Sequence, residues 1–167
     1  MTQKSDLTFG PLRPEHIDDM ERIEVECFSV PWSREALEDE LDNPYARYVV
    51  CTDPNGKVVG YIGSRIVLDS ADITNVAVRP QYRRQGIGYD LVTRMLEQMA
   101  GLGVTSVLLE VRESNLPAQN CYARAGFTVV GRRKNYYDHP KEDCIIMTLY
   151  FDEELAKTIP VSGDLPS

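Results

Sequence analysis

The sequence has few of the residues from which metal centres and disulfide frameworks are built. It contains two histidines in 167 residues, which excludes most histidine-rich metal sites. Its four cysteines are widely spaced and include no C-x-x-C pair: Cys27, Cys51, Cys121 and Cys144. Because each lies among apolar neighbours, we interpret them as reduced thiols of a protein core. We therefore expect neither a metal nor a disulfide.

Positive charge and long apolar runs are also scarce. Lys and Arg number 18 against 26 Asp and Glu, so the formal net charge is −8. Nucleic-acid binding needs a broad basic face and is not expected, whereas an acidic surface suits a cationic partner or simply keeps the protein soluble. The first nine residues do not form a signal peptide, and the longest apolar stretch, 144–151, is too short to span a bilayer. We expect a cytoplasmic protein without membrane association.

The remaining pattern predicts one domain. Apolar residues make up 43% of the chain, enough for a core of its own. Their periodicity predicts strands at 7–9, 47–52, 57–68, 72–78, 105–111, 128–136 and 144–150. Helices are predicted at 14–27, 33–43, 86–102 and 117–125. We therefore expect a single α+β domain over residues 7–151, a mixed sheet with helices on both faces, and an acidic, flexible tail over residues 152–167.

The most informative segment is N-V-A-V-R-P-Q-Y-R-R-Q-G-I-G, residues 75–88. An apolar strand is followed by a basic loop, two glycines and a helix. Glycines at a helix start let an anion approach free backbone N–H groups, and the helix dipole adds positive charge there. With Arg79, Arg83 and Arg84, the segment predicts a pyrophosphate site; a solvated arginine cluster at an ordinary helix start is the alternative.

Other phosphate-binding loops fit this segment less well. The sequence has no G-x-x-x-x-G-K-[ST], so a nucleoside triphosphate loop is excluded. The dinucleotide fingerprint fails because Leu91 stands where its third glycine is required.

The R-R-Q-G-I-G motif at 83–88 resembles the acetyl-CoA pyrophosphate loop of the GNAT family of N-acetyltransferases, and the element order matches over residues 7–150. The resemblance implies the GNAT fold, with a mostly antiparallel sheet, and an acetyl-CoA-dependent acyltransferase without a metal. Backbone groups of Val76, Ala77 and Val78 would hold the pantetheine and the acetyl carbonyl. The pyrophosphate would be bound by the segment that contains Arg83, Arg84, Gln85, Gly86, Ile87, Gly88 and Tyr89.

Further segments resemble the bacterial RimI branch of this family. They are L-E-V-R-E-S-N at 109–115, A-G-F at 125–127, N-Y-Y at 135–137 and P-W-S at 31–33. This resemblance implies transfer of the acetyl group to the N-terminal α-amine of a ribosomal protein of the small subunit. The chain after Phe151 is not covered by it.

Glu110 lies in a strongly apolar predicted strand, where an unpaired carboxylate is costly. Strand alternation places it on one face with Leu108 and Arg112, so it is a solvent-facing residue, a partner of Arg112 or a functional group. The resemblance implies the last: Glu110 would be the general base that takes a proton from the incoming ammonium through a water.

Tyr122 follows Glu110 by a strand end and a helical turn, so both can face one cleft. Simple packing under the sheet is the alternative. The resemblance implies that Tyr122 donates a proton to the departing CoA thiolate, which suits a phenol with pKa about 10 and a thiol with pKa about 8.5. Asn115 is expected to cap the following helix or, by the resemblance, to contact the cofactor.

Aromatic residues mark the acceptor side. By the resemblance, Tyr136 and Tyr137 lie on a hairpin beside the backbone of the acceptor peptide, and Phe28, Pro31 and Trp32 shape the opposite wall. Ordinary core packing is the alternative for them. An α-amine also suits a lone glutamate base, because its pKa is about 7.8 against about 10.4 for lysine.

Three functions stay open at this point. The first is N-terminal acetylation of a protein, and the second is acetylation of a small amine such as a polyamine, an amino acid or an antibiotic. The third is a non-catalytic acetyl-CoA sensor. The presence of both Glu110 and Tyr122 argues against the sensor, because a binding module has no use for a proton-transfer pair.

Overall fold

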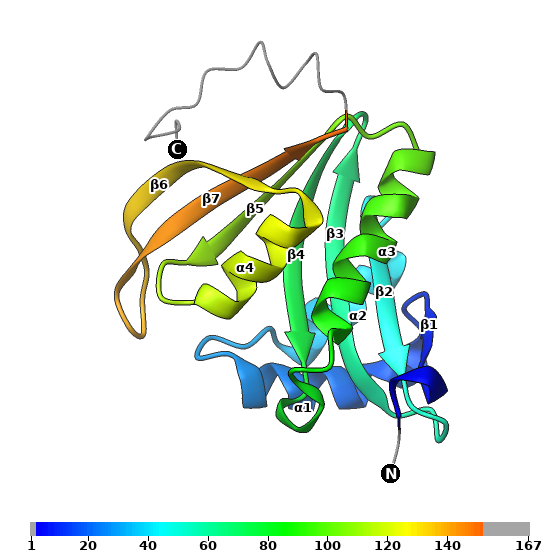
Figure 1. Cartoon of the computed structure of the whole chain (residues 1–167). Coiled ribbons are helices and arrows are strands. Elements are labelled where there is room, and N and C mark those ends of the chain that lie inside the picture. The colour runs from blue at the N-terminus through cyan, green and yellow to red at the C-terminus, as the bar shows by residue number, and fades with distance from the viewer. Residues whose placement is uncertain (1–2, 152–167) are drawn as a thin grey trace.

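In the computed structural model, which describes residues 3–151, the predicted strands form one seven-stranded sheet (Figure 1). The strand order is β1-β2-β3-β4-β5-β7-β6. All neighbouring strands are antiparallel except β4 and β5, which are parallel. This confirms the mixed, mostly antiparallel sheet. The predicted acidic tail, residues 152–167, lies outside the described residues.

The element boundaries agree closely with the sequence-based prediction. The strands are β1 (Thr8–Gly10), β2 (Ala46–Thr52), β3 (Val58–Val67), β4 (Ser70–Val78), β5 (Ser106–Arg112), β6 (Thr128–Tyr137) and β7 (Glu142–Tyr150). The helices are α1 (Ile17–Cys27), α2 (Arg34–Asp42), α3 (Ile87–Gly101) and α4 (Leu116–Ala125). Short 3-10 helices lie at Lys4–Asp6, Pro14–His16 and Pro80–Tyr82. No helix in the described range is long and apolar enough to cross a membrane.

Local sequence signals explain where several elements begin. The Ser33 hydroxyl accepts a hydrogen bond from the Ala36 N–H at 3.1 Å and so caps α2, as predicted. The Asp53 carboxylate accepts from the backbone N–H groups of Asn55 and Lys57, which closes the turn between β2 and β3. These contacts satisfy backbone donors that a helix or strand end leaves unpaired.

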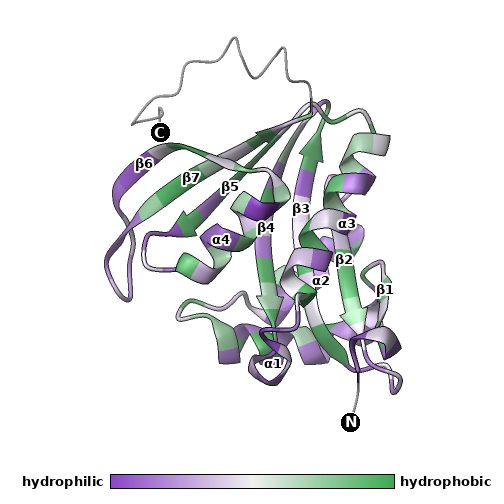
Figure 2. Cartoon of the chain, viewed as in Figure 1, coloured by the Kyte–Doolittle hydropathy of each residue, from purple (hydrophilic) through white to green (hydrophobic). Residues whose placement is uncertain are grey.

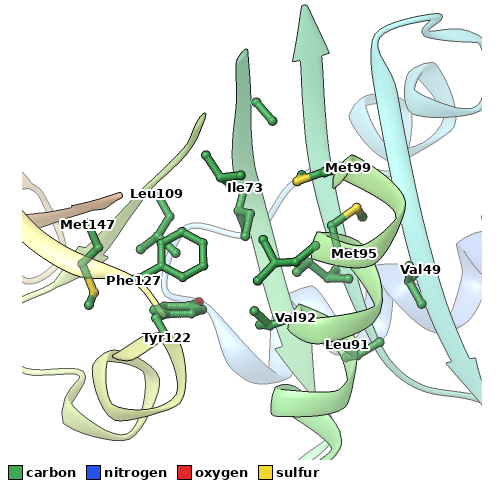
Figure 3. Close-up of a cluster of buried hydrophobic side chains, with 14 of the residues drawn as sticks. Val49, Ile73, Leu91, Val92, Met95, Met99, Leu109, Tyr122, Phe127 and Met147 are labelled. Carbon is green, nitrogen blue, oxygen red and sulfur yellow. The ribbon is translucent and has the colours of Figure 1, made fainter. Parts of the chain in front are cut away.

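Two hydrophobic clusters cover the two faces of the sheet. One packs α3 and α4 against the sheet and includes Leu91, Leu109 and Tyr122 (Figure 3). The other packs α1 and α2 against the opposite face and includes Met20 and Tyr61. Hydrophobic residues are concentrated in the strands, whereas the loop between β6 and β7 is hydrophilic (Figure 2). Helices therefore lie on both faces, as the sequence predicts.

The feature that positions the site is the short contact between β4 and β5. Only three residue pairs join these strands, ending at Asp72 and Leu108, after which the strands diverge (Figure 1). The second half of β4, from Ile73 to Val78, therefore has no strand partner on its β5 side. A backbone edge without a strand partner leaves donors and acceptors available for a ligand.

Candidate active site

The predicted pyrophosphate loop has the backbone geometry of an anion site. Arg84 and Gly86 both have positive φ, 65° and 80°, and α3 begins directly after Gly86, which supplies no side-chain cap. The first N–H groups of α3 have no partner within the helix, and a side chain does not cover them from the cap position. Backbone N–H groups and a helix dipole directed to one point favour an anionic group, so these residues fit a pyrophosphate.

The three arginines of this loop have different partners. Arg79 is a structural residue: it forms ion pairs with Asp19 at 3.5 Å and Glu26 at 3.9 Å, and its side chain is 14% exposed. Arg83 donates to the Val78 carbonyl at 3.3 Å and so joins the loop to the end of β4. The positive charge expected from Arg79 is therefore neutralised, which leaves Arg83 and Arg84 as the loop's cations.

Gly88 and Tyr89 lie in the first turn of α3, and Ile87 between them and Gly86 is buried under the sheet. The Tyr89 ring is covered by the Arg124 guanidinium at 4.3 Å, which ties the start of α3 to α4. Gln85 lies between the two positive-φ residues of the loop. The predicted phosphate segment is therefore one continuous turn at the helix start.

Glu110 lies on β5 two residues beyond Leu108, the last residue paired with β4. Its carboxylate is paired with Arg133 Nη1 at 3.3 Å and accepts a contact from Cys144 Sγ at 3.7 Å. Burial, and then the charge of Glu110 and a hydrogen bond to it, raise the pKa of Tyr136. The alternative in which Glu110 pairs with Arg112 is wrong, because Arg112 pairs with Glu142 at 3.2 Å.

A second carboxyl group lies near Glu110. Burial, followed by the negative charge of Glu110, raises the pKa of Asp72, and Arg65 opposes this shift. Asp72 is the last β4 residue that is paired with β5. The point of divergence between β4 and β5 is therefore acidic on this face.

Tyr122 lies on the other side of the sheet from Glu110. It is 8% exposed, its ring packs edge-on against Phe127 with 6.0 Å between centroids, and burial raises the pKa of its hydroxyl. Leu109 packs in the same cluster as Tyr122 (Figure 3). Val111 also belongs to this cluster, so strand alternation turns the intervening Glu110 away from it. Glu110 and Tyr122 therefore lie on opposite faces of the sheet, and the cleft that they were expected to share stays a prediction.

Asn115 caps α4, as one of its two interpretations predicts. Its side-chain oxygen accepts from the Ala118 N–H at 3.2 Å. The cap fixes the start of the helix that carries Tyr122. Contact of Asn115 with the cofactor stays a prediction.

The predicted acceptor residues form two separate segments. Tyr136 and Tyr137 lie on the β6–β7 hairpin with their rings edge-on at 5.1 Å, and Tyr136 is 46% exposed. Phe28 and Trp32, on the loop between α1 and α2, are half-buried against the α1–α2 cluster, whereas Pro31 is exposed. Core packing therefore accounts for part of the Phe28 and Trp32 surface.

Two residues that hold these segments in place, Glu24 and Arg133, were not predicted from the sequence. Glu24 is 1% exposed and accepts hydrogen bonds from the Trp32 N–H at 2.8 Å and from the Tyr61 hydroxyl. Arg133 binds Glu110, although its own Nε is buried and has no hydrogen-bond partner among the described residues. Glu24 is one of several acidic residues in the amphipathic helix α1, and its sequence does not show which of them is buried. An arginine on a hairpin belongs to no distinctive motif. The sequence therefore carries no signal for either role.

A pocket of about 860 Å³ lies elsewhere, between β2, the end of α2 and the last turns of α3. Arg47, Arg94 and Glu97 are among the residues that line it, and none of the predicted site residues does. We therefore place the candidate site at the β4–β5 divergence, where β4 loses its strand partner close to Glu110, and not at this pocket.

Comparison with known proteins identifies the family of this chain. Over 129 residues, the chain is 35% identical to the ribosomal protein bS18-alanine N-acetyltransferase of Escherichia coli, covering 76% of this chain and 86% of that protein. A Bacillus subtilis protein that carries this name provisionally is 41% identical over 143 residues, covering 85% of this chain and 94% of that protein. The crystal structure of the E. coli enzyme superposes with a TM-score of 0.81 at 32% identity, covering 87% of this chain and 94% of that chain.

The fold extends to more distant proteins. Arabidopsis thaliana NAA60, solved in complex with acetyl-CoA, superposes with a TM-score of 0.80 at 20% identity, covering 87% of this chain and 98% of that chain. The family model described as the acetyltransferase (GNAT) family matches residues 17–127. The chain therefore belongs to the GNAT family and is an acetyl-CoA-dependent N-acetyltransferase.

Proposed function

We propose that this chain acetylates the N-terminal α-amine of a protein, with a ribosomal protein as the acceptor. The names of its bacterial relatives support this acceptor class. The observation that carries the proposal is the position of Glu110, whose carboxylate lies at the β4–β5 divergence beside Tyr136 of the exposed hairpin. A base at that point, next to an exposed aromatic hairpin, suits the end of a flexible peptide.

Acetyl-CoA would bind along the free edge of β4. Backbone groups of Val76, Ala77 and Val78 lie on the part of β4 without a β5 partner and would hold the pantetheine and the acetyl carbonyl. The segment 83–89 would hold the pyrophosphate, because its backbone N–H groups and the α3 dipole favour an anion. When bound, acetyl-CoA supplies the activated acetyl group.

The chain's own residues would then move two protons. Glu110 would accept a proton from the acceptor ammonium through a water, which leaves a neutral amine able to attack the thioester carbon. As the new C–N bond forms and the C–S bond breaks, Tyr122 would donate its proton to the departing thiolate. The second proton, which the nitrogen loses as the amide forms, would pass through water and restore the Tyr122 hydroxyl. Burial raises the pKa of Tyr122, which supports this role because the hydroxyl stays protonated at neutral pH.

The acceptor would lie between Trp32 on one side and Tyr136 and Tyr137 on the other. Main-chain contacts with these segments, together with an exposed carboxylate at Glu110, would favour an extended N-terminus. A small amine lacks the peptide backbone that the hairpin would contact. No contact in the described residues specifically favours a polyamine.

The test is thiol release from acetyl-CoA with three acceptors. These are a short peptide with a free N-terminal alanine, the same peptide with a blocked N-terminus and an added lysine, and spermidine. We expect turnover with the free α-amine alone. Turnover with spermidine alone would assign the chain to small-amine acetylation, and binding of acetyl-CoA without turnover on any acceptor would support a sensor.

A further inference from the structure

Arg112, the last residue of β5, binds the tip of the β6–β7 hairpin through several groups at once. Its guanidinium donates to the carbonyl oxygens of Pro140 at 3.0 Å and Asp138 at 3.1 Å, and to Glu142 at 3.2 Å. It also covers the Tyr137 ring with 4.4 Å to the centroid. One planar group with five N–H donors therefore holds the turn, one strand and an aromatic side chain of the hairpin.

The same guanidinium reaches the loop between α1 and α2. Arg112 Nη2 lies 3.5 Å from the Ser29 hydroxyl, and Ser29 is three residues from Trp32 in the loop 28–33. Within the described part of the chain, no hydrogen bond directly joins the loop 28–33 to the hairpin residues 134–143. Arg112 is thus the polar link between two segments that are far apart in the sequence.

We propose that Arg112 is a positioning residue that sets the distance between the loop 28–33 and the hairpin 134–143 and thereby the affinity for the acceptor. The inference rests on the proposed function, because it takes these two segments as the sides of the acceptor site. Arg112 does not act on the reacting atoms: its two Nη groups donate to the hairpin and Ser29, and Glu110 is bound by Arg133 instead.

Arg132 provides a matched control. It is also an arginine of this half of the sheet, and it pairs with two carboxylates, Glu113 at 2.7 Å and Asp143 at 2.9 Å. Its side chain is 40% exposed, and among the residues described it makes no contact with the loop 28–33. Loss of Arg132 therefore removes a comparable charge and comparable ion pairs but no link between the two segments.

The experiment compares Arg112→Met, Arg112→Lys and Arg132→Met in the full chain. Lysine keeps the charge beside Glu142 but lacks the planar fork, so it cannot bind two carbonyls and Ser29 together. Trp32 is the only tryptophan of the chain, so acrylamide quenching of its fluorescence reports on the loop directly. The kinetic measurements are kcat and KM for a peptide with a free N-terminal alanine, together with the Kd for acetyl-CoA and the Tm.

For Arg112→Met we expect the peptide KM to rise about tenfold while kcat stays within about threefold, because uniform binding is lost and the reacting groups are unchanged. Quenching of Trp32 should increase about twofold and the acetyl-CoA Kd should stay within about twofold. Arg112→Lys should lie between this variant and the wild type, and it serves as the test if Arg112→Met does not fold. Arg132→Met should leave the peptide KM, kcat, the quenching of Trp32 and the acetyl-CoA Kd within about twofold of the wild type.

Equal changes in peptide KM for Arg112→Met and Arg132→Met would overturn the proposal, as would an unchanged Trp32 signal in both Arg112 variants. The Trp32 measurement also separates this inference from the proposed function. If the wild type acetylates no free N-terminus, the proposed function fails. Increased Trp32 quenching in Arg112→Met but not Arg132→Met would still support Arg112 as the residue that holds the loop, and unchanged quenching would refute it.

Discussion

At the scale of single residues, the site combines two ionisable groups in opposite environments. The Glu110 side chain is 30% exposed and is held by Arg133, whereas Tyr122 is buried against Phe127. Solvent access suits a base that works through water. Burial disfavours a phenolate, so the Tyr122 hydroxyl carries its proton at neutral pH before the reaction.

Glu110→Gln is expected to lower kcat by about 10²- to 10³-fold, because the amide cannot accept the proton. The acetyl-CoA Kd should stay within about twofold, since Glu110 is not part of the phosphate segment. Thiol release and isothermal titration measure the two quantities. Glu113→Gln is the control, because Glu113 pairs with Arg132 at the surface. Near-normal turnover in Glu110→Gln would remove Glu110 from the role of base.

Tyr122→Phe is expected to lower kcat about 10- to 100-fold by the same factor at every pH from about 6 to about 9. The loss is independent of pH because burial raises the pKa of Tyr122 above its ordinary value of about 10. The hydroxyl therefore stays protonated from about pH 6 to about pH 9. The measurement is kcat against pH for both proteins. A ratio that shrinks as the pH rises towards 9 would contradict a protonated Tyr122.

At the scale of elements, the start of α3 decides whether the phosphate loop can form. Gly86 has φ of 80°, a conformation that costs an L-residue about 1–2 kcal/mol. A Cβ at this position would lie 3.1 Å from Lys4 Nζ, the end of a flexible side chain that pairs with Asp90 at 2.7 Å. Backbone strain, and not this contact, is therefore the main obstacle to another residue at Gly86.

Gly86→Ala is expected to raise the acetyl-CoA Kd about tenfold, because the loop must change φ and turn its N–H groups away from the anion. Gly101→Ala in the last turn of the same helix is the matched control. Gly101 has no positive φ and no atom within 4 Å of a new Cβ, so alanine should stabilise the helix by about 0.5–1 kcal/mol and leave the Kd unchanged. Equal Kd values for the two variants would show that the loop conformation is unimportant for binding.

At the scale of the whole molecule, buried and surface carboxyl groups give opposite pH dependences of stability. Burial raises the pKa of Glu24, and the hydrogen bonds from Tyr61 and Trp32 only partly oppose this. The pKa values of Glu142 and Asp143 are lowered by hydrogen bonds from Ser114 and Asn135 and by nearby arginines. Glu24 therefore contributes stability that is lost as the pH rises above the pKa that Glu24 has in the unfolded chain. Glu142 and Asp143 contribute stability that is lost as the pH falls into the acid range.

Glu24→Gln tests this balance for the whole fold. Below a pH of about 4, Glu24 is protonated in both the folded and the unfolded state, so variant and wild type should have similar Tm values. As the pH rises, Glu24 ionises more readily in the unfolded wild type than in the folded one, which favours unfolding. The variant has no such group, so its Tm should increase relative to that of the wild type. Thermal unfolding followed by circular dichroism from pH 4 to pH 8 gives the comparison; a constant Tm difference would contradict a raised pKa.

The local features of this protein could be predicted from its sequence because each depends on neighbouring residues. The caps at Ser33 and Asn115 and the glycine turn before α3 follow from side chains that bond backbone groups within a few positions. The apolar stripe of α3, including Leu91 and Met95, follows from helical periodicity. The order of these elements and their motifs also carried the family assignment, which the comparisons confirm.

The partners of the site residues could not be predicted, because they depend on strand register. Pairing of β6 with β7 and of β7 with β5 brings Arg133 to Glu110 and sends Arg112 to Glu142. A pair between Glu110 and Arg112 was one of three interpretations that the sequence left open, since both residues lie on one face of β5. Residues two apart on one strand face are close, but residues of other strands can bind the same charge. Here Glu142 of β7 pairs with Arg112, and Arg133 of β6 pairs with Glu110.

The sequence by itself determined the fold class and the helix and strand positions, and its resemblance to a family named the candidate phosphate loop, acid and base. These depend on periodicity, turn residues and short motifs, all of which are local along the chain. Only the tertiary structure decided that Glu110 and Tyr122 lie on opposite faces of the sheet, that β4 and β5 separate after three residue pairs, and that Arg112 links the loop 28–33 to the hairpin. Those facts depend on packing and register between distant segments, which no local pattern encodes.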